Sequence, residues 1–458
     1  MVLLVGGCAS VYPPQNKPVS EIDESSGYRR LSIMDSRVVG ENLVLLAFSG
    51  GGTRAAALSY GVMQELRDTE LKVNGEKVSL LDHVEVISSV SGGSFTSAYY
   101  GLYRNQLFTD YEDDFLRKGV QDALIHKMLS PGQWPRSISS GIDRTEMAVD
   151  YYDRSIFKGA TFEDLSKNGP PFIDINATDL STGMRFTFTQ ELFDLICSDL
   201  SSFPIARAVT ASSAVPVAFP SVVLENHAEQ CDVSDTLGWK LIEQTRPVSN
   251  NQQALLDGIK SYRDSDERPY IHLVDGGIAD NLGLRTLISR IESLSTAVKF
   301  DLLQSNRVEN ILIILVNAQA KHERLIDKSA EKPSASKTMS ACVAAQMSRY
   351  NHDTLDQLRL NIERFDNLAS DIGYAVKVHF AQVNFEAAES EEIRAYLNGL
   401  PTSLQLNDGQ IDRLIAAGRY LLRTEPSFLE FKRRANAETS SSAISKEALF
   451  HFFSNSSD

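Results

Sequence analysis

From residue 42 onward, short apolar runs alternate with helix-like segments, and this alternation constrains the fold more than any other feature of the chain. Residues 43–48 (LVLLAF) and 310–317 (NILIILVN) are continuous apolar runs, as expected of strands buried on both faces of a sheet. The pattern predicts an α/β fold around a mostly parallel sheet. The other expected strands are residues 84–90, 172–176 and 271–274, and the expected helices are residues 55–67, 95–103 and 284–294.

Beyond residue 320, helical periodicity dominates. Residues 337–367 place apolar side chains three or four positions apart, which predicts a long amphipathic helix. Residues 376–385 alternate like a strand. A further helix includes residues 411–422, with Asn407 or Asp408 as its N-cap.

The N-terminal residues 1–9 (MVLLVGGCA) form an apolar run in which small residues precede Cys8. This run resembles a bacterial lipobox, where such a cysteine is lipidated, although no Lys or Arg precedes it and it is shorter than an ordinary signal peptide. Residues 10–28 show no periodicity and suit a flexible tether. We expect a membrane-associated bacterial lipoprotein anchored through Cys8. The alternative is a frayed apolar N-terminus on a cytoplasmic protein.

We therefore expect three parts of the chain. Residues 1–30 are a signal remnant and tether, and residues 31–320 form the main domain. Residues 321–458 form an α-rich region that packs on the main domain or completes its sheet. We favour completion of the sheet over a separate helical cap.

Charge excludes one class of partner. Sixty acidic residues against 45 basic ones give a net charge of −15. An acidic surface repels nucleic-acid phosphates, and it disfavours a broad polybasic membrane patch, so any membrane contact should be apolar or covalent. No apolar run approaches the roughly 18 residues that span a bilayer. The oligomeric state does not follow from the sequence.

The four cysteines show no CxxC pairing, which disfavours a zinc site, and we expect neither a metal nor a cofactor. Cys197, Cys231 and Cys342 are expected to be small buried residues. If the protein is exported, Cys197 and Cys231 are candidates for a disulfide.

A run of three glycines lies in residues 49–54 (SGGGTR), between an expected strand and an expected helix. Glycines leave backbone N–H groups free to point at one anionic atom, and a helix N-terminus adds a partial positive charge. An oxyanion site is one interpretation. A tight turn is the other, since a nucleotide phosphate loop would need a lysine that is absent here.

The second segment, residues 88–94 (SSVSGGS), has the pattern of a nucleophile elbow around Ser91. Such a turn is crowded, so it needs small residues two positions before and after the nucleophile, and Ser89 and Gly93 meet this need. The expected strand before it and helix after it are the required context. A simple helix cap at Ser91 is the alternative.

The third segment is residues 274–283 (VDGGIADNLG), in which Asp275 follows a strand and precedes two glycines. A carboxylate at the carboxyl end of a strand is presented to the crevice where α/β folds place their sites. An Asx-turn is the alternative interpretation.

Together, these three segments resemble the patatin-like phospholipase family, which includes relatives similar to cytosolic phospholipase A2. Residues 176–183 (NATDLSTG) and 211–216 (ASSAVP) support the resemblance, which covers about residues 42–318. Ser89 departs from the family pattern, in which Gly is usual. The resemblance implies a three-layer sandwich with a central, mostly parallel sheet and additional C-terminal helices.

The resemblance also implies a serine lipid acyl hydrolase with a Ser91–Asp275 dyad that cleaves carboxylic esters through an acyl-Ser91 intermediate. Asp275 would act as general base, which requires partial desolvation to raise its basicity. The N–H groups of Gly51, Gly52 and Gly92 would form the oxyanion hole.

The implied partners are a lipid ester and a membrane surface. Arg54 matches a basic position of the family and is a candidate contact for a lipid phosphate, with a structural ion pair as the alternative. Two other functions share these residues. One is an acyltransferase that uses the same dyad, and the other is a catalytically silent lipid-binding lipoprotein.

A Ser–Asp–His triad is the rival to the dyad. His322, His352 and His379 follow Asp275 in the required order, but none lies in a recognisable turn motif. We expect each to be an ordinary surface or core residue, and His272 to pack in the sheet. Residues 223–269 form a long polar insertion, interpreted as a lid or as a plain surface excursion.

Overall fold

The computed structural model describes residues 13–30, 40–73, 75–122, 143–216, 218–247, 250–293, 308–321, 326–328 and 330–454. Cys8 and His322 lie outside these residues. None of the helices described in these ranges is both long enough and apolar enough to cross a membrane.

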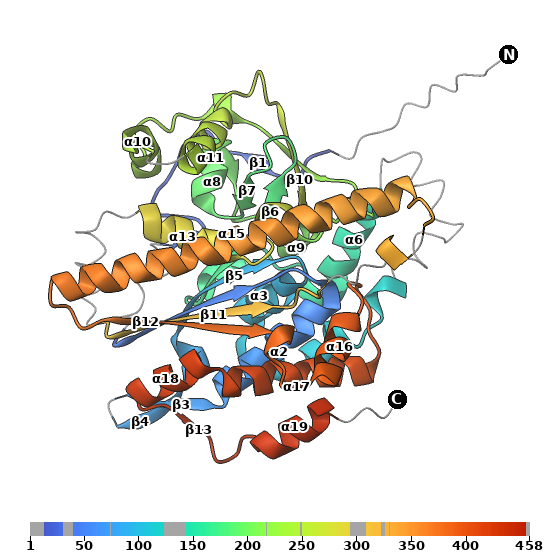
Figure 1. The fold of residues 1–458 in the computed structure, drawn as a ribbon. Coiled ribbons are helices and arrows are strands. Elements are labelled where there is room, and N and C mark those ends of the chain that lie inside the picture. The colour runs from blue at the N-terminus through green and yellow to red at the C-terminus, as the bar shows by residue number, and fades with distance from the viewer. Residues whose placement is uncertain are drawn as a thin grey trace.

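An eight-stranded sheet organises the molecule (Figure 1). The strands β12, β11, β2, β5 and β6 follow one another in this order and are parallel, whereas β10, β9 and β7 pair antiparallel at the other side. All of β5 and β6 is buried, including polar residues such as Glu85 and Asp174. The bounds are β12 Lys377–Asn384, β11 Asn310–Asn317, β2 Asn42–Phe48, β5 Val84–Val90, β6 Phe172–Asp179, β10 Tyr270–Asp275, β9 Val222–Glu225 and β7 Arg185–Thr187.

Helices cover both faces of this sheet, and the predicted three-layer sandwich with a mostly parallel sheet is confirmed. On one side lie α2 (Gly52–Arg67) and α17 (Asp408–Thr424), and α15 (Ala335–Asp371) crosses the molecule on the other side (Figure 1). The helices α2 and α17 approach closely because glycines meet backbone: a Cβ on Gly61 would overlap the carbonyl of Ile415.

The remaining elements are short. Two small sheets pair β1 (Lys17–Pro18) with β8 (Ser198–Asp199), and β13 (Glu438–Thr439) with β3 (Thr69–Val73) and β4 (Glu76–Ser79). The other α-helices are α3 Gly92–Tyr103, α6 Arg144–Tyr152, α7 Phe162–Lys167, α8 Gln190–Leu195, α9 Ile205–Ser212, α10 Leu237–Gln244, α11 Asn250–Ser261, α12 Gly277–Asp280, α13 Leu284–Ser293, α16 Glu391–Gly399, α18 Pro426–Arg434 and α19 Lys446–Ser454. The single turns of 3₁₀ or π type are η1 Leu80–His83, η2 Arg104–Phe108, η3 Glu112–Leu116, η4 Asp153–Phe157, η5 Ala228–Gln230, η6 Ile326–Lys328 and η7 Phe385–Ala387.

The last third of the chain contributes to the sheet as well as to the helices around it. Strand β12 runs parallel to β11 along its full length and forms one edge of the sheet. The helix α17 begins after Asn407, whose side chain accepts a hydrogen bond from the N–H of Gln410 in a capping box. Of the two predicted caps, Asn407 is therefore the N-cap, and Asp408 is the first helical residue.

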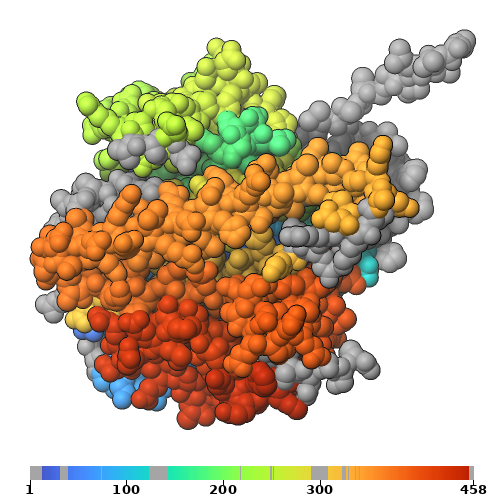
Figure 2. All heavy atoms as spheres, in the orientation of Figure 1, coloured from blue at the N-terminus to red at the C-terminus, as the bar shows by residue number. Residues whose placement is uncertain are grey.

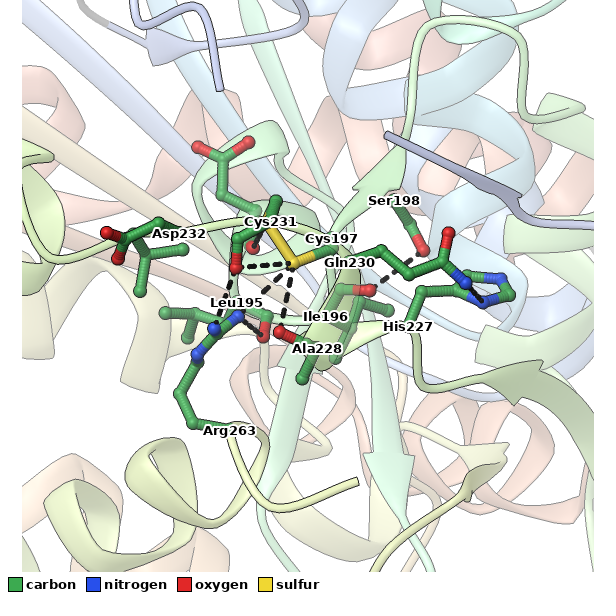
Figure 3. Close-up of a disulfide and its surroundings, with 12 residues drawn as sticks. Leu195, Ile196, Cys197, Ser198, His227, Ala228, Gln230, Cys231, Asp232 and Arg263 are labelled. Carbon is green, nitrogen blue, oxygen red and sulfur yellow. Dashed lines mark hydrogen bonds between the residues drawn. A yellow bond between two sulfur atoms is a disulfide. The ribbon is translucent and has the colours of Figure 1, made fainter. Parts of the chain in front are cut away.

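A disulfide joins Cys197, two residues after the end of α8, to Cys231, which directly follows η5 (Figure 3). Arg263 lies against it and donates hydrogen bonds to Leu195 O and Cys231 O, each at 3.0 Å. Cys342 is exposed on α15, so the expectation that it is buried was wrong. Its position lies on the solvent side of an amphipathic helix.

The polar insertion between β9 and β10 forms α10 and α11. Besides the disulfide, Tyr262 Oη donates a hydrogen bond of 3.0 Å to Asp179 Oδ2, and Arg268 pairs with the same carboxylate. The helix α11 also packs on Met184, which leaves no space for a side chain at Gly258. These contacts hold the insertion against the body of the protein, and they favour its interpretation as a surface excursion over that as a lid.

Candidate active site

Ser91 lies at a sharp turn between β5, which ends at Val90, and α3, which begins at Gly92. Its φ of 51° and ψ of −121° are strained for a residue with a side chain, as in an elbow that exposes a nucleophile. The turn is crowded: a Cβ on Gly92 would overlap Gly52 O, and one on Gly93 would lie 2.7 Å from Phe48 Cβ. Small residues are therefore required here.

The departure from the family pattern at Ser89 is accommodated by hydrogen bonds. The Ser89 hydroxyl donates to Asp174 O at 3.1 Å and accepts a bond of 2.6 Å from the hydroxyl of Ser97 on α3. These two hydrogen bonds offset the cost of burying the hydroxyl, and they tie β5 to the helix that follows the elbow.

Asp275 faces the elbow. Ser91 Oγ donates a hydrogen bond of 3.0 Å to Asp275 Oδ2, and the other carboxylate oxygen accepts the N–H of Gly277 at 2.7 Å. Burial raises the pKa of Asp275 from 3.8 to about 6, against the opposing effect of the hydrogen bonds from Gly277 and Ser91. The carboxylate is therefore a stronger base than an exposed aspartate.

Asp275 reaches the site by a route that differs from the sequence expectation. Because β10 runs antiparallel to β6, its direction alone would not bring its carboxyl end to the edge of the sheet where the parallel strands end. Instead, β6 continues three residues beyond Asn176, the partner of Val90, and β10 returns beside this extension. Asp275 pairs with Ala177, which brings its carboxylate level with Ser91.

The glycine run lies next to the elbow. The N–H of Gly50 donates to Asn281 O at 3.0 Å and is therefore engaged. Gly51 and Gly52 have φ of 144° and 62°, values that favour glycine. At the start of α2 and α3, the N–H groups of Gly51, Gly52 and Gly92 have no acceptor among the described residues. Gly52 N would lie 2.7 Å from a Cβ on Gly92, so two of these predicted donors are close together.

Arg54, the candidate phosphate contact, lies next to the glycine run, with its Nη2 3.6 Å from the position of a Cβ on Gly51. Its side chain is buried and donates to Ala318 O at 2.9 Å, Leu400 O at 2.5 Å and Thr402 Oγ1 at 2.9 Å. These acceptors are neutral, so no ion pair of Arg54 is seen among the described residues, and the phosphate contact stays a prediction. Desolvation lowers the pKa of Arg54 to about 10. The guanidinium joins the glycine run to the segment after α16.

Ser212 was not singled out from the sequence, although it lies in the ASSAVP segment. Its hydroxyl donates to Asn176 O at 2.6 Å, accepts the N–H of Ser91 at 2.8 Å, and contacts Ser94 Oγ at 2.9 Å. The carbonyl of Ser212 accepts the N–H of Gly276 at 3.0 Å. One residue thus holds both the elbow and the turn that follows Asp275.

Asn281 is the second residue that sequence reasoning missed. It is 5% exposed, and none of the hydrogen bonds seen among the described residues involves its side-chain amide. Its Oδ1 lies 2.7 Å from the position of a Cβ on Gly50 and 3.0 Å from one on Gly277. The amide therefore lies between the glycine run and the turn that holds Asp275.

No described histidine forms a hydrogen bond with Asp275. His379 is buried on β12 against Phe431, and His352 is exposed on α15. His272 is exposed on β10, with Nδ1 2.9 Å from Ser221 Oγ, so the expectation that it packs in the sheet was wrong. Its side chain points to the solvent side because side chains alternate along a strand. The described residues also contain no cluster of His, Cys, Asp or Glu that could hold a metal ion.

The fold and site together define an α/β protein in which an elbow serine faces a buried carboxylate. A family model described as patatin-like phospholipase matches residues 46–288, which is more than half of the chain. The chain belongs to the patatin-like phospholipase family.

Among curated proteins, no match was found. Solved structures similar to the chain include human GIVD cytosolic phospholipase A2, with 14% identity, 59% of this chain and 45% of that chain covered, and a TM-score of 0.33. Another is the complex of full-length SpcU with full-length ExoU from the type III secretion system of Pseudomonas aeruginosa. That match has 16% identity, 59% coverage of each chain and a TM-score of 0.21. The alignments thus span about half of the length of these proteins.

Proposed function

We propose that the protein is a lipid acyl hydrolase that cleaves carboxylic ester bonds with a Ser91–Asp275 dyad. The observation that carries the proposal is the hydrogen bond of 3.0 Å from Ser91 Oγ to Asp275 Oδ2 at a strained elbow. Membership of the patatin-like phospholipase family supports a lipid ester as the substrate.

In the acylation step, Ser91 Oγ attacks the ester carbonyl carbon while its proton passes to Asp275 Oδ2. A serine hydroxyl is a poor nucleophile until a base takes this proton, and a carboxylate with a pKa of about 6 is well suited to accept it near neutral pH. The bond from the N–H of Gly277 holds the other oxygen, which keeps Oδ2 directed at Ser91.

The tetrahedral intermediate carries its negative charge on the former carbonyl oxygen. We assign its stabilisation to the N–H groups of Gly51, Gly52 and Gly92, each of which is typically worth roughly 3 to 4 kcal/mol. Collapse of the intermediate breaks the ester C–O bond, and Asp275 returns the proton to the leaving alcohol. Water then attacks acyl-Ser91 with Asp275 again as base, which releases the fatty acid and restores the serine.

Covalent labelling tests the proposal. A fluorophosphonate probe should label the folded protein at Ser91, and Ser91→Ala should abolish labelling. Asp275→Asn should reduce it strongly, because the base is lost. Ser213→Ala is the matched control, since the hydroxyl of this half-buried serine bonds, among the described residues, only to carbonyls of α9. His352→Ala should also be labelled normally. Labelling that survives in Ser91→Ala would refute the assignment, and a silent lipid-binding protein would show none in the wild type.

Product analysis separates hydrolysis from acyl transfer on the same dyad. With a phospholipid and an added alcohol or lysolipid, we expect free fatty acid as the main product. A new ester formed in preference to fatty acid would identify an acyltransferase.

We also propose that the protein is an exported lipoprotein attached to a membrane through Cys8, a residue outside the described ranges. The Cys197–Cys231 disulfide supports export, because disulfides persist in oxidising compartments. In cells fed labelled palmitate, the wild type should incorporate label and Cys8→Ser should not. Equal label in both would contradict the anchor.

A further inference from the structure

The first half of α15, residues 335–350, is a surface helix without a buried side chain among its described positions. Met339 is 56% exposed and Tyr350 is 38% exposed. The second half differs, because Asn351, Thr354 and Leu358 are buried against the body of the protein. Figure 2 shows α15 as a ridge of orange atoms across the surface.

The charges of the two halves differ in the same way. Residues 335–350 (ASKTMSACVAAQMSRY) contain Lys337 and Arg349 and no acidic residue. Residues 351–371 contain five acidic and two basic residues, in keeping with the net charge of −15 of the chain. The segment is therefore locally cationic on an acidic protein, and a cationic surface is attracted to anionic lipid headgroups.

The same segment contacts the candidate active site. Three atoms surround the position that a Cβ on Gly277 would occupy: Met347 Cε at 2.9 Å, Asp275 Oδ1 at 3.0 Å and Asn281 Oδ1 at 3.0 Å. Met347 of α15 thus lies beside the turn that holds the proposed base. An apolar side chain at this place is compatible with an acyl chain that arrives along the helix.

Two contacts hold the segment in this position. The guanidinium of Arg285, on α13, lies 3.5 Å from the ring centroid of Tyr350, and its Nε donates to Thr354 Oγ1 at 2.9 Å. Only the short helix α12 separates α13 from Asp275, so these contacts tie α15 to the site.

We propose that residues 335–350 of α15 dock onto an anionic lipid bilayer and present the Ser91 site to it. This inference rests on the proposed function, since a hydrolase that acts on membrane lipids takes its substrate from a bilayer. The absence of acidic residues and the contact with the site favour a bilayer over a second copy of the chain.

Partitioning onto vesicles tests the docking surface. All variants carry Ser91→Ala so that no lipid is consumed, and vesicles of phosphatidylcholine are used with and without phosphatidylglycerol. Met339→Asp should lower partitioning onto the anionic vesicles by about tenfold, because an apolar contact is replaced by a like charge. Lys337→Glu should lower it to a similar extent, and most of that loss should vanish on vesicles of phosphatidylcholine alone.

Leu360→Asp is the matched control, since Leu360 is 52% exposed on the second half of the same helix. Its partitioning should equal that of the parent. Equal losses of partitioning in Met339→Asp and Leu360→Asp would overturn the proposal. The absence of any loss in both Lys337→Glu and Met339→Asp would overturn it as well. So would a dimer, seen by sedimentation, that Met339→Asp dissociates without any change in vesicle binding.

The proposed function has a separate test. The chain with Ser91 intact is assayed on a soluble short-chain ester in the absence of vesicles. If this hydrolysis is absent, the proposed function fails, while the vesicle experiment still decides whether residues 335–350 bind lipid.

Discussion

Ser91 and Asp275 are 184 positions apart in sequence, yet the serine hydroxyl donates a hydrogen bond of 3.0 Å to the aspartate. The bond joins two elements of one sheet, the elbow after β5 and the end of β10, with β6 between them. Because β6 extends past the end of β5, the antiparallel β10 can place its last residue at the level of the elbow.

The activity should fall on the acid side. Asp275 must be ionised to accept the serine proton, and its pKa is about 6. We expect kcat/KM for a soluble ester to lose about tenfold for each pH unit below 6. A profile that stays flat down to pH 4.5 would show that Asp275 is not the base.

Asp275 should lower the stability of the folded protein at neutral pH. Its folded pKa is raised from 3.8 to about 6, so the protonated form is favoured by folding. The protonated carboxyl contributes about 3 kcal/mol to the free energy of unfolding below pH 4, and this contribution is lost as the pH rises through 6. We therefore expect the Tm of Asp275→Asn, relative to the wild type, to increase between pH 4 and pH 7. A constant difference over this range would contradict the burial of the charge.

Gly92→Ala should damage both stability and activity. The added methyl group would overlap Gly52 O, where backbone meets backbone and no flexible side chain can yield. We expect a loss of about 2 kcal/mol in the free energy of unfolding and of at least about 100-fold in kcat/KM. Gly399→Ala is the control, because a Cβ there meets no atom within 4 Å. Denaturant unfolding and ester hydrolysis measure the two effects.

Arg54→Ala should reduce stability without changing the preference among lipids. The variant leaves the carbonyls of Ala318 and Leu400 without their buried donor, which typically costs about 1 to 3 kcal/mol for each group. The ratio of rates on a phospholipid and on an acylglycerol should stay the same. A selective loss of the phospholipid rate would restore the phosphate contact.

Asn281→Asp should move the acid limb of the pH profile to higher pH. The new carboxylate would lie beside the turn that holds Asp275, and a like charge raises the pKa of its neighbour further. Asn281→Ala adds no charge, so its limb should remain near pH 6 even where kcat falls. An unshifted limb in Asn281→Asp would place the amide away from the reacting groups.

Much of the fold followed from local patterns. The apolar runs at β2 and β11 and the amphipathic periodicity of α15 predicted these elements, because burial on both faces or on one face leaves a direct mark in the sequence. The direction of β10 left no such mark. A run as short as residues 271–274 can pair with a neighbour in either direction, so only the packed sheet decides it.

The candidate site was also predicted only in part, and for the same reason. Residues with unusual local constraints, such as Ser91 between small neighbours, were predicted from the sequence. Ser212 and Asn281 were not, since a serine in a helix and an asparagine in a turn are ordinary until tertiary contacts show what they touch. The acceptors of Arg54 that the structure shows, the carbonyls of residues 318 and 400, were not predicted either, because they come from distant segments of the chain.

The sequence by itself determined the elements and the small residues at each turn, because helix period, strand burial and glycine-only backbone angles are local properties. Only the tertiary structure decided which groups meet. The pairing of Ser91 with Asp275, the burial that raises the pKa of that carboxyl, and the contact of Met347 with the same turn depend on chain segments brought together by packing.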